Sequence, residues 1–292
     1  DQFDAKLTLS AYQRLSIRSP LDAVFVIGSP PANVLTPTTE RQRQILVAIG
    51  GSDPAIVQGR HYSFIHWVIP EVLGKKLAAE MSRRDFKRIA FVTAEVSGAL
   101  ADRGGAVEAL EALGMKKRIV YDQNFEKGNA DYRAALNAIR AKDADAVVLV
   151  LFPGALSAFV KQARDLGLKS EIIGVETFED EAEVKAANGA MNGRWYVNAS
   201  DPSDEFVRLY KAKYGEHPGW ASANAYDTMN LLAKALAAGK RSSDEIRDYL
   251  GTLRDYHGAC GTYSASGDNR FLLPAALKRV TEDGFKSIEK SD

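Results

Sequence analysis

Residues 146–174 read AVVLVLFPGALSAFVKQARDLGLKSEIIG, and this stretch decides the fold. It opens with seven apolar residues, 146–152, continues with an amphipathic segment at 155–166 and ends with a short β-like run at 171–174. The first run is continuously apolar rather than alternating, which is typical of a strand that helices cover on both faces. Gly167 is of the type that ends helices. The stretch therefore predicts a strand, a helix and a second, parallel strand.

The same alternation extends over most of the chain. Short β-like runs and helix-length segments follow one another, which favours parallel sheets joined by right-handed crossovers and hence an α/β fold. The expected strands are residues 23–27, 45–49, 88–93, 118–121, 146–151, 171–174, 195–197 and 275–280. The expected helices between them are residues 74–82, 99–113, 131–141 and 155–166.

Residues 201–253 have an almost entirely helical pattern instead. Asp201-Pro202 has the residue types of an N-cap followed by a first helical position. A second long helix is expected over residues 221–238. Ser242 and Glu245 have the spacing of a capping box and predict the start of a third helix.

Length and composition narrow the class of protein. The chain has 292 residues, which suggests about two domains at ~150 residues each. Lys plus Arg and Asp plus Glu both number 38, so the net charge is 38 − 38 = 0, which argues against a nucleic-acid partner. The longest apolar run is seven residues, whereas a membrane span needs roughly 20. One cysteine, Cys260, excludes an internal disulfide.

Catalytic and cofactor motifs are absent from the sequence. It has no dinucleotide or phosphate-binding glycine motif, no zinc-protease motif and no nucleophile elbow. We expect the histidines to be surface or hinge residues rather than metal ligands; they are His61, His66, His217 and His257. The sequence therefore predicts no metal, no cofactor and no enzymatic activity.

Three segments together resemble the type I periplasmic binding proteins of branched-chain amino acid ABC importers. The first combines residues 22–29, DAVFVIGS, with residues 45–54, ILVAIGGSDP. The second and most specific is FVKQARDLGLK at 159–169 followed by IGVE at 173–176. The third starts at residues 218–232, PGWASANAYDTMNLL, and continues through the glycines at 258, 261 and 267. The resemblance covers essentially the whole chain.

This resemblance implies two lobes, each a parallel sheet flanked by helices. Lobe 1 is expected to comprise residues 1–67 and 198–258, and lobe 2 residues 68–197 and 259–292. In the family the second strand of lobe 1 ends in residue types that match the first residues of this chain. The resemblance therefore implies that lobe 1 lacks the family's N-terminal strand, helix and strand, and that residues 5–15 match the family's second helix.

The resemblance also implies where a ligand binds. In the family, two loops of lobe 1 hold a carboxylate, which here correspond to Ser29 and to Gly50, Gly51 and Ser52, with Ser52 on the carboxylate-binding hydroxyl. Glu176 matches the carboxylate of lobe 2 that pairs with an amino group. Two alternatives stay open. Ser52 also has the residue type of an N-cap before Asp53-Pro54, and Glu176 also suits a surface loop.

Aromatic residues at the ends of the expected strands extend the candidate site. Trp67, Phe152 and Phe178 lie where the resemblance implies pocket walls, although each ring alone also suits a core. The pattern departs from the family at Ser97, where a tyrosine is usual, and at Ala221, which replaces another tyrosine. These departures leave the identity of the ligand open.

The resemblance implies a solute-binding component of an ABC importer that closes two lobes on a small carboxylate-bearing ligand, with an amino acid as the first choice. Its partners are then the ligand and an ABC permease, and its location is the periplasm or cell exterior after removal of a signal peptide. Two alternatives remain: a ligand-sensing domain of the same fold, and a binder of aromatic or keto acids.

Overall fold

The computed structural model describes residues 4–18 and 21–288, and it divides into two compact units. Unit 1 contains Asp1–Ile69 and Ser200–Pro274, and unit 2 contains Pro70–Ala199 and Ala275–Asp292. Each unit is thus assembled from two separate segments of the chain. Residues 1–3, where the resemblance places the end of a preceding strand, lie outside the described residues.

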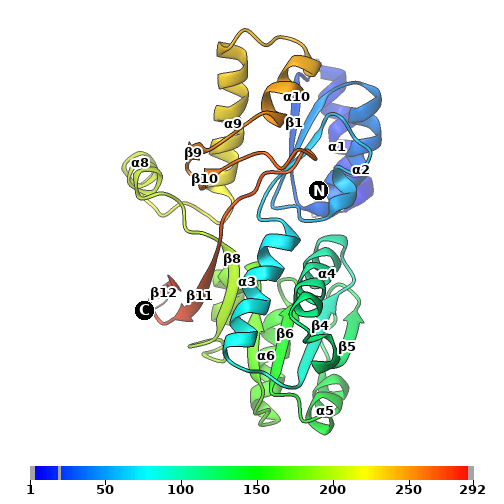
Figure 1. The fold of residues 1–292 in the computed structure, drawn as a ribbon, viewed down its shortest axis with the longest axis vertical. Helices are drawn as coiled ribbons and strands as arrows, with labels where there is room; N and C mark the ends of the chain where they lie inside the picture. The colour runs from blue at the N-terminus through cyan, green and yellow to red at the C-terminus, as the bar shows by residue number, and fades with distance from the viewer. Residues whose placement is uncertain (1–3, 19–20, 289–292) are drawn as a thin grey trace. The chain divides into compact units, whose positions relative to one another are not determined.

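Unit 2 is built on a sheet that has seven strands within the described residues (Figure 1). Their order is β12-β11-β8-β7-β6-β4-β5; the pairs from β5 to β8 are parallel, and β11 is antiparallel to β8 and β12. Strands β4 and β6 are buried along their whole length, as the continuous apolar runs predict. The strands are β4 (Ile89–Ala94), β5 (Ile119–Phe125), β6 (Ala146–Val150), β7 (Glu171–Gly174), β8 (Trp195–Ala199), β11 (Ala275–Thr281) and β12 (Gly284–Ser287).

Two helices of unit 2 approach each other through glycine. A Cβ at Gly74 of α3 would lie 2.2 Å from the carbonyl oxygen of Gly105 in α4, and a Cβ at Gly105 would lie 2.3 Å from that of Pro70. Only residues without a side chain allow the two helices to pack this closely. The helices of unit 2 are α3 (Pro70–Arg83), α4 (Ser97–Ala112), α5 (Arg133–Ala141), α6 (Ala155–Asp165) and α7 (Glu181–Ala186).

Unit 1 contains a parallel sheet of three described strands in the order β1-β2-β3. The central strand, β2, is buried at every position, whereas β1 lies at the sheet edge and is partly exposed. A short antiparallel pair, β9 with β10, lies apart from this sheet. The strands are β1 (Ala23–Ile27), β2 (Ile45–Ile49), β3 (Ser63–His66), β9 (Tyr256–Gly258) and β10 (Gly261–Tyr263).

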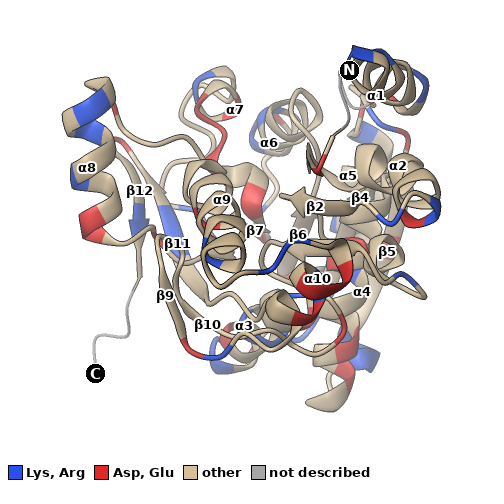
Figure 2. Ribbon diagram, turned by 90° about the horizontal axis from the view of Figure 1, so that it is seen from above, with Lys and Arg blue, Asp and Glu red and all other residues tan. Residues whose placement is uncertain are grey.

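The helices of unit 1 begin where their capping residues allow. The predicted capping box is confirmed, because Ser242 and Glu245 exchange hydrogen bonds at the start of α10. The predicted start at Asp201-Pro202 is wrong: α8 begins at Asp204, because the Ser203 side chain accepts the N–H of Phe206. In Figure 2, α8 carries acidic residues at one end and basic residues at the other, which suits the helix dipole. The helices are α1 (Ala5–Arg18), α2 (Ser29–Arg41), α8 (Asp204–Tyr214), α9 (Ser222–Ala237) and α10 (Ser243–Gly251).

Residues 259–274 belong to unit 1, whereas the sequence places them in lobe 2. The backbone N–H groups of Ala259 and Cys260 donate to the carboxylate of Asp227, which lies in α9 of unit 1. Tyr263 and Phe271 are buried in the same hydrophobic core as β2. The chain therefore enters unit 2 for the last time only at β11, because these contacts hold the preceding segment in unit 1.

The fold is α/β with parallel sheets flanked by helices, as the sequence predicts. Among the described residues, every helix is too short or too polar to cross a bilayer.

Candidate ligand-binding site

Two loops of unit 1 meet at the carboxyl ends of β1 and β2. The Ser29 hydroxyl oxygen accepts the backbone N–H of Ser52 at 3.0 Å and that of Asp53 at 3.2 Å. The N–H of Gly28 donates to the carbonyl oxygen of Ile49 at 2.9 Å. Because two N–H groups occupy both acceptor positions of the Ser29 hydroxyl, its proton points elsewhere and is a donor. The structure therefore brings the predicted residues Ser29 and Ser52 together.

The start of α2 offers fewer backbone donors than most helix N-termini. Pro30 and Pro31 occupy its first turn and have no N–H, and the N–H of Ala32 donates to the carbonyl oxygen of Gly28. An anion at this end of the sheet therefore depends on the Ser29 hydroxyl and on the loop after β2, rather than on a row of helix N–H groups.

The loop after β2 is tightly built. Gly50 has a φ of +64°, and a Cβ there would lie 2.7 Å from two ring carbons of Trp220. A Cβ at Gly51 would lie 3.2 Å from the side chain of Ile56. The N-cap alternative for Ser52 is wrong, because the Asp53 side chain accepts the N–H of Ala55 and caps the short 3₁₀ helix Pro54–Ile56. Ser52 itself is buried.

A buried polar network lies beside this loop. The amide nitrogen of Asn224 is 3.3 Å from Nδ1 of His66, and Nε2 of His66 is 2.9 Å from the Tyr263 hydroxyl. Tyr263 donates in turn to the carboxylate of Asp227 at 3.1 Å. Since Asn224 donates to Nδ1, the proton of the neutral ring resides on Nε2 and is donated to Tyr263. Each side chain in the network therefore donates a hydrogen bond to the next, from Asn224 through His66 and Tyr263 to Asp227.

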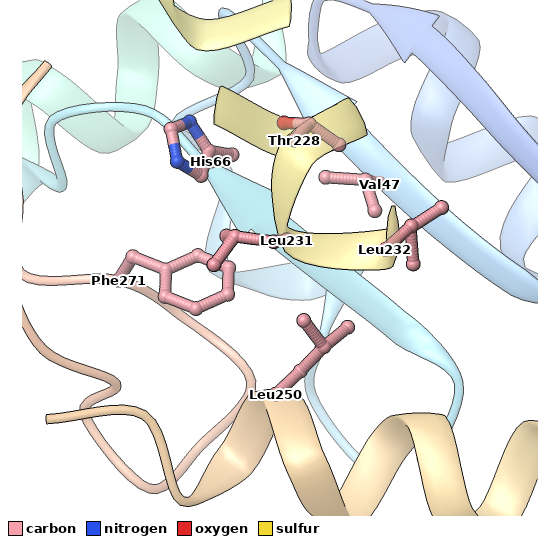
Figure 3. A pocket seen from close by; sticks show the side chains of 7 residues that line it. All are labelled: Val47, His66, Thr228, Leu231, Leu232, Leu250 and Phe271. Atoms are coloured by element: carbon pink, nitrogen blue, oxygen red, sulfur yellow. The ribbon is translucent and has the colours of Figure 1, made fainter. Parts of the chain in front are cut away.

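Apolar surroundings keep the His66 ring neutral. Figure 3 shows the ring of His66 near Leu231 and Phe271, in a small space that is otherwise lined by Val47, Thr228, Leu232 and Leu250. Burial lowers the pKa of His66 to about 3. Burial also raises the pKa of Tyr263, and the Asp227 carboxylate adds to this effect. Both hydrogen-bonding side chains therefore stay uncharged at neutral pH.

The sequence pattern does not predict this network, although two of the segments that carry the resemblance form it. Asp227 lies in the PGWASANAYDTMNLL segment, and Gly258 is the first of the later glycines. A Cβ at Gly258 would lie 2.3 Å from the Asp227 carboxylate. The glycine at position 258 is therefore the sequence signal of this network, because it lets the backbone approach the Asp227 carboxylate closely.

In unit 2, Glu176 opens the short 3₁₀ helix Glu176–Glu179, which follows β7. Glu179 holds this helix in place, because its carboxylate accepts the Tyr196 hydroxyl at 3.0 Å and lies 2.8 Å from Nζ of Lys278. The Glu176 side chain is only partly buried. The geometry thus fixes the backbone at Glu176 at the carboxyl end of a central parallel strand.

The aromatic candidates of unit 2 have different surroundings. Phe178 is fully buried, and its ring lies so close to Gly174 that a Cβ there would be 2.0 Å from a ring carbon. Phe178 thus packs in the interior of unit 2. Phe152 is partly exposed and precedes α6. The N-terminus of α6 is already occupied, because Glu183 accepts the N–H groups of Gly154 and Ser157.

The candidates therefore fall into two groups. Ser29, Gly50, Gly51, Ser52 and Trp67 lie in unit 1, and Phe152, Glu176 and Phe178 lie in unit 2. Among the described residues, no three His, Cys, Asp or Glu side chains are arranged to hold a metal ion. The chemistry that unit 1 presents is hydrogen-bond donation, and that of Glu176 is a negative charge.

An α/β protein of two units, each made from two chain segments and each with loops at the carboxyl ends of parallel strands, has the architecture of a two-lobed binding protein. A family model described as periplasmic binding protein matches residues 1–285. The chain belongs to this family and has its type I fold.

Solved structures share this fold. The leucine-binding protein LivK of Thermotoga maritima is 19% identical, with a TM-score of 0.88 over 98% of this chain and 84% of that chain. The protein LivJ of Streptococcus pneumoniae, in complex with isoleucine, is 24% identical, with a TM-score of 0.82 over 98% and 85%. A solute-binding protein of an ABC transporter of Rhodopseudomonas palustris, in complex with 3,4-dihydroxybenzoic acid, is 18% identical, with a TM-score of 0.85 over 100% and 84%.

Proposed function

We propose that the protein is the solute-binding component of an ABC importer and that its ligand is a small carboxylate, with an amino acid as the ligand class. The observation that carries the proposal is the junction at Ser29 and Ser52, where a serine hydroxyl that already accepts two N–H groups has its proton to donate. Membership of the periplasmic binding protein family supports a transport role.

The mechanism that we propose is closure of the two units on the ligand. Unit 1 holds the carboxylate through the Ser29 and Ser52 hydroxyls and the backbone of Gly51, and Glu176 of unit 2 pairs with the amino group. A ligand that has both groups stabilises the closed state more than the open state, and this difference in affinity drives closure. The closed protein then delivers the ligand to a permease in the periplasm or at the cell exterior.

A second ligand class is an aromatic or keto acid. The ring of Trp220, which packs edge-to-face on the buried Trp67 beside Gly50, favours it, because the exposed part of this indole offers apolar surface next to the donor loop. The Rhodopseudomonas palustris protein, which has the same fold, was crystallised with 3,4-dihydroxybenzoic acid. Such a ligand has no amino group and makes no use of the Glu176 charge.

Calorimetric titration of the whole protein tests the proposal and separates the two classes. The ligands are L-leucine and L-phenylalanine with their deaminated analogues, 4-methylpentanoate and 3-phenylpropanoate. We expect an amino acid to bind roughly 30-fold more tightly than its analogue, because loss of a charge-assisted hydrogen bond costs about 2 kcal/mol. Tighter binding of the deaminated acids supports the second class, and absence of binding by all four ligands and by benzoate contradicts the proposal.

A further inference from the structure

Trp220 differs from the other two tryptophans in its exposure. Trp67 and Trp195 are each 1% exposed, whereas Trp220 is 54% exposed. It lies in the connection between α8 and α9 of unit 1. An indole that is half exposed leaves a large apolar area in contact with water. Such exposure is unusual unless another molecule covers the ring.

The position of the Trp220 ring is set by two contacts. Its six-membered ring lies directly on Gly50, where a Cβ would be 2.7 Å from both Cζ3 and Cη2. The same side chain is in edge-to-face contact with Trp67, with ring centroids 5.3 Å apart and an interplanar angle of 87°. The Trp220 ring therefore fits only where residue 50 is glycine. This contact places the indole beside the loop that leads to Ser52.

Trp67 is a rigid support for this ring. It follows His66, whose ring is hydrogen-bonded at both nitrogens by Asn224 and Tyr263. The indole N–H of Trp67 is buried and meets no hydrogen-bond acceptor among the described residues. A buried donor without an acceptor costs stability, so the Trp67 indole contributes to unit 1 through its packing rather than through a hydrogen bond.

We propose that the exposed part of Trp220 is a stacking subsite for a planar aromatic ring carried by the ligand. The inference rests on the proposed function, in which the neighbouring loop holds the carboxylate of that ligand. A ring that lies against a fixed indole gains the offset or edge-to-face interactions that a saturated ring of the same size lacks. The ligand class is therefore an aromatic carboxylate, such as an aromatic amino acid or a benzoate.

The test compares ligands that differ only in the aromaticity of the ring. The two pairs are L-phenylalanine with L-cyclohexylalanine and benzoate with cyclohexanecarboxylate, titrated by calorimetry into the whole protein. In the pair that binds, we expect the aromatic member to bind roughly 2- to 12-fold more tightly. Trp220→Leu abolishes this preference, and Trp220→Phe keeps most of it. The control is Tyr214→Leu, since Tyr214 of α8 is also half exposed, and this variant keeps the full preference.

Fluorescence gives a second readout from the same variants. Trp220 is the exposed member of the three tryptophans, so ligand binding shifts the emission of the wild-type protein to shorter wavelength, and Trp220→Phe removes the shift. Equal affinities within each pair, or a preference that survives Trp220→Leu, overturn the inference while binding itself leaves the proposed function intact. Absence of binding by all four ligands overturns the inference, and it contradicts the proposed function as well only if L-leucine, 4-methylpentanoate and 3-phenylpropanoate also fail to bind.

Discussion

The parallel sheets of the two units differ in how completely their strands are buried. In unit 2, strands β4 and β6 are buried throughout, and strands on both sides cover them. In unit 1, β2 and β3 are buried throughout, but the edge strand β1 leaves Phe25 and Ile27 exposed by 38% and 49%. Unit 1 adds a buried polar network that ties α9 to the segment after β9. Both units contain satisfied buried polar groups, but those of unit 2 hold single helix starts, such as Glu183 at α6, whereas Asp227 of unit 1 joins α9 to a segment more than 30 residues further along the chain.

Asp227→Ala is expected to have the largest effect on stability. The substitution leaves the N–H groups of Ala259 and Cys260 and the hydroxyl of Tyr263 without their acceptor. At about 1–2 kcal/mol for each buried unsatisfied group, unit 1 should lose roughly 3–6 kcal/mol. Hydrogen exchange measured by mass spectrometry should show lost protection in unit 1 and unchanged protection in β4 and β6.

The matched variant in unit 2 is Glu183→Ala. Glu183 is also a buried carboxylate, but it accepts only two backbone N–H groups, at the start of α6. We expect a smaller loss, about 2–4 kcal/mol, confined to unit 2. Equal losses of protection in both units for either variant would show that the units do not differ as described.

Gly74→Ala should destabilise unit 2 by about 2–3 kcal/mol, because its Cβ would collide with the backbone of Gly105. The control is Gly104→Ala. Gly104 lies in α4 with open space around its Cα, so the added methyl group should stabilise the helix by roughly 0.5–1 kcal/mol. Urea unfolding followed at Trp195 measures both variants. If the Gly74→Ala protein is as stable as the Gly104→Ala protein, the close packing of α3 against α4 described above is contradicted.

His66 makes the stability of unit 1 depend on pH. The unfolded chain binds a proton near pH 6.5, whereas the folded ring, with a pKa of about 3, does not. The free energy of unfolding therefore falls as the pH falls from 6.5 to about 3, by up to ~1.4 kcal/mol per pH unit. Between pH 7 and pH 5 this residue should account for about 2 kcal/mol.

Urea unfolding of the wild type and of His66→Gln, each in a Trp195→Phe background, measures this dependence. With Trp195 removed, the remaining tryptophans, Trp67 and Trp220, both report on unit 1. The variant should show a shallower loss of stability between pH 7 and pH 5. The same slope in both proteins would contradict a neutral, buried His66.

The sequence predicts the strands well where apolar runs are continuous. The strands at 23–27, 45–49 and 171–174 agree with β1, β2 and β7 at both ends. It does not predict α2, because Pro30, Pro31 and Pro37 read as helix breakers. The first two lie in the first turn, where proline is tolerated.

The candidate site is predicted in part. The resemblance points to Ser29 and Ser52, and in the structure the backbone N–H of Ser52 donates to the Ser29 hydroxyl. The contact of Trp220 with Gly50 joins residues 170 positions apart, and no local pattern indicates it. The network of His66, Tyr263 and Asp227 is equally long-range. Such contacts depend on how α9 packs beside the sheet, which hydrophobic periodicity does not specify.

The central claim is that opposite chemistry on the two units holds one ligand. The most direct test is calorimetric titration of Glu176→Ala and Ser52→Ala with the tighter-binding of L-leucine and L-phenylalanine and with its deaminated analogue. Glu181 is exposed, and Glu181→Ala serves as the control for the loss of one negative charge. Glu176→Ala should weaken the amino acid by roughly 2–4 kcal/mol, or about 30- to 1000-fold, and leave the deaminated acid unchanged. Ser52→Ala should weaken both ligands by about 1–2 kcal/mol. Unchanged affinity of both ligands in both variants would contradict the account.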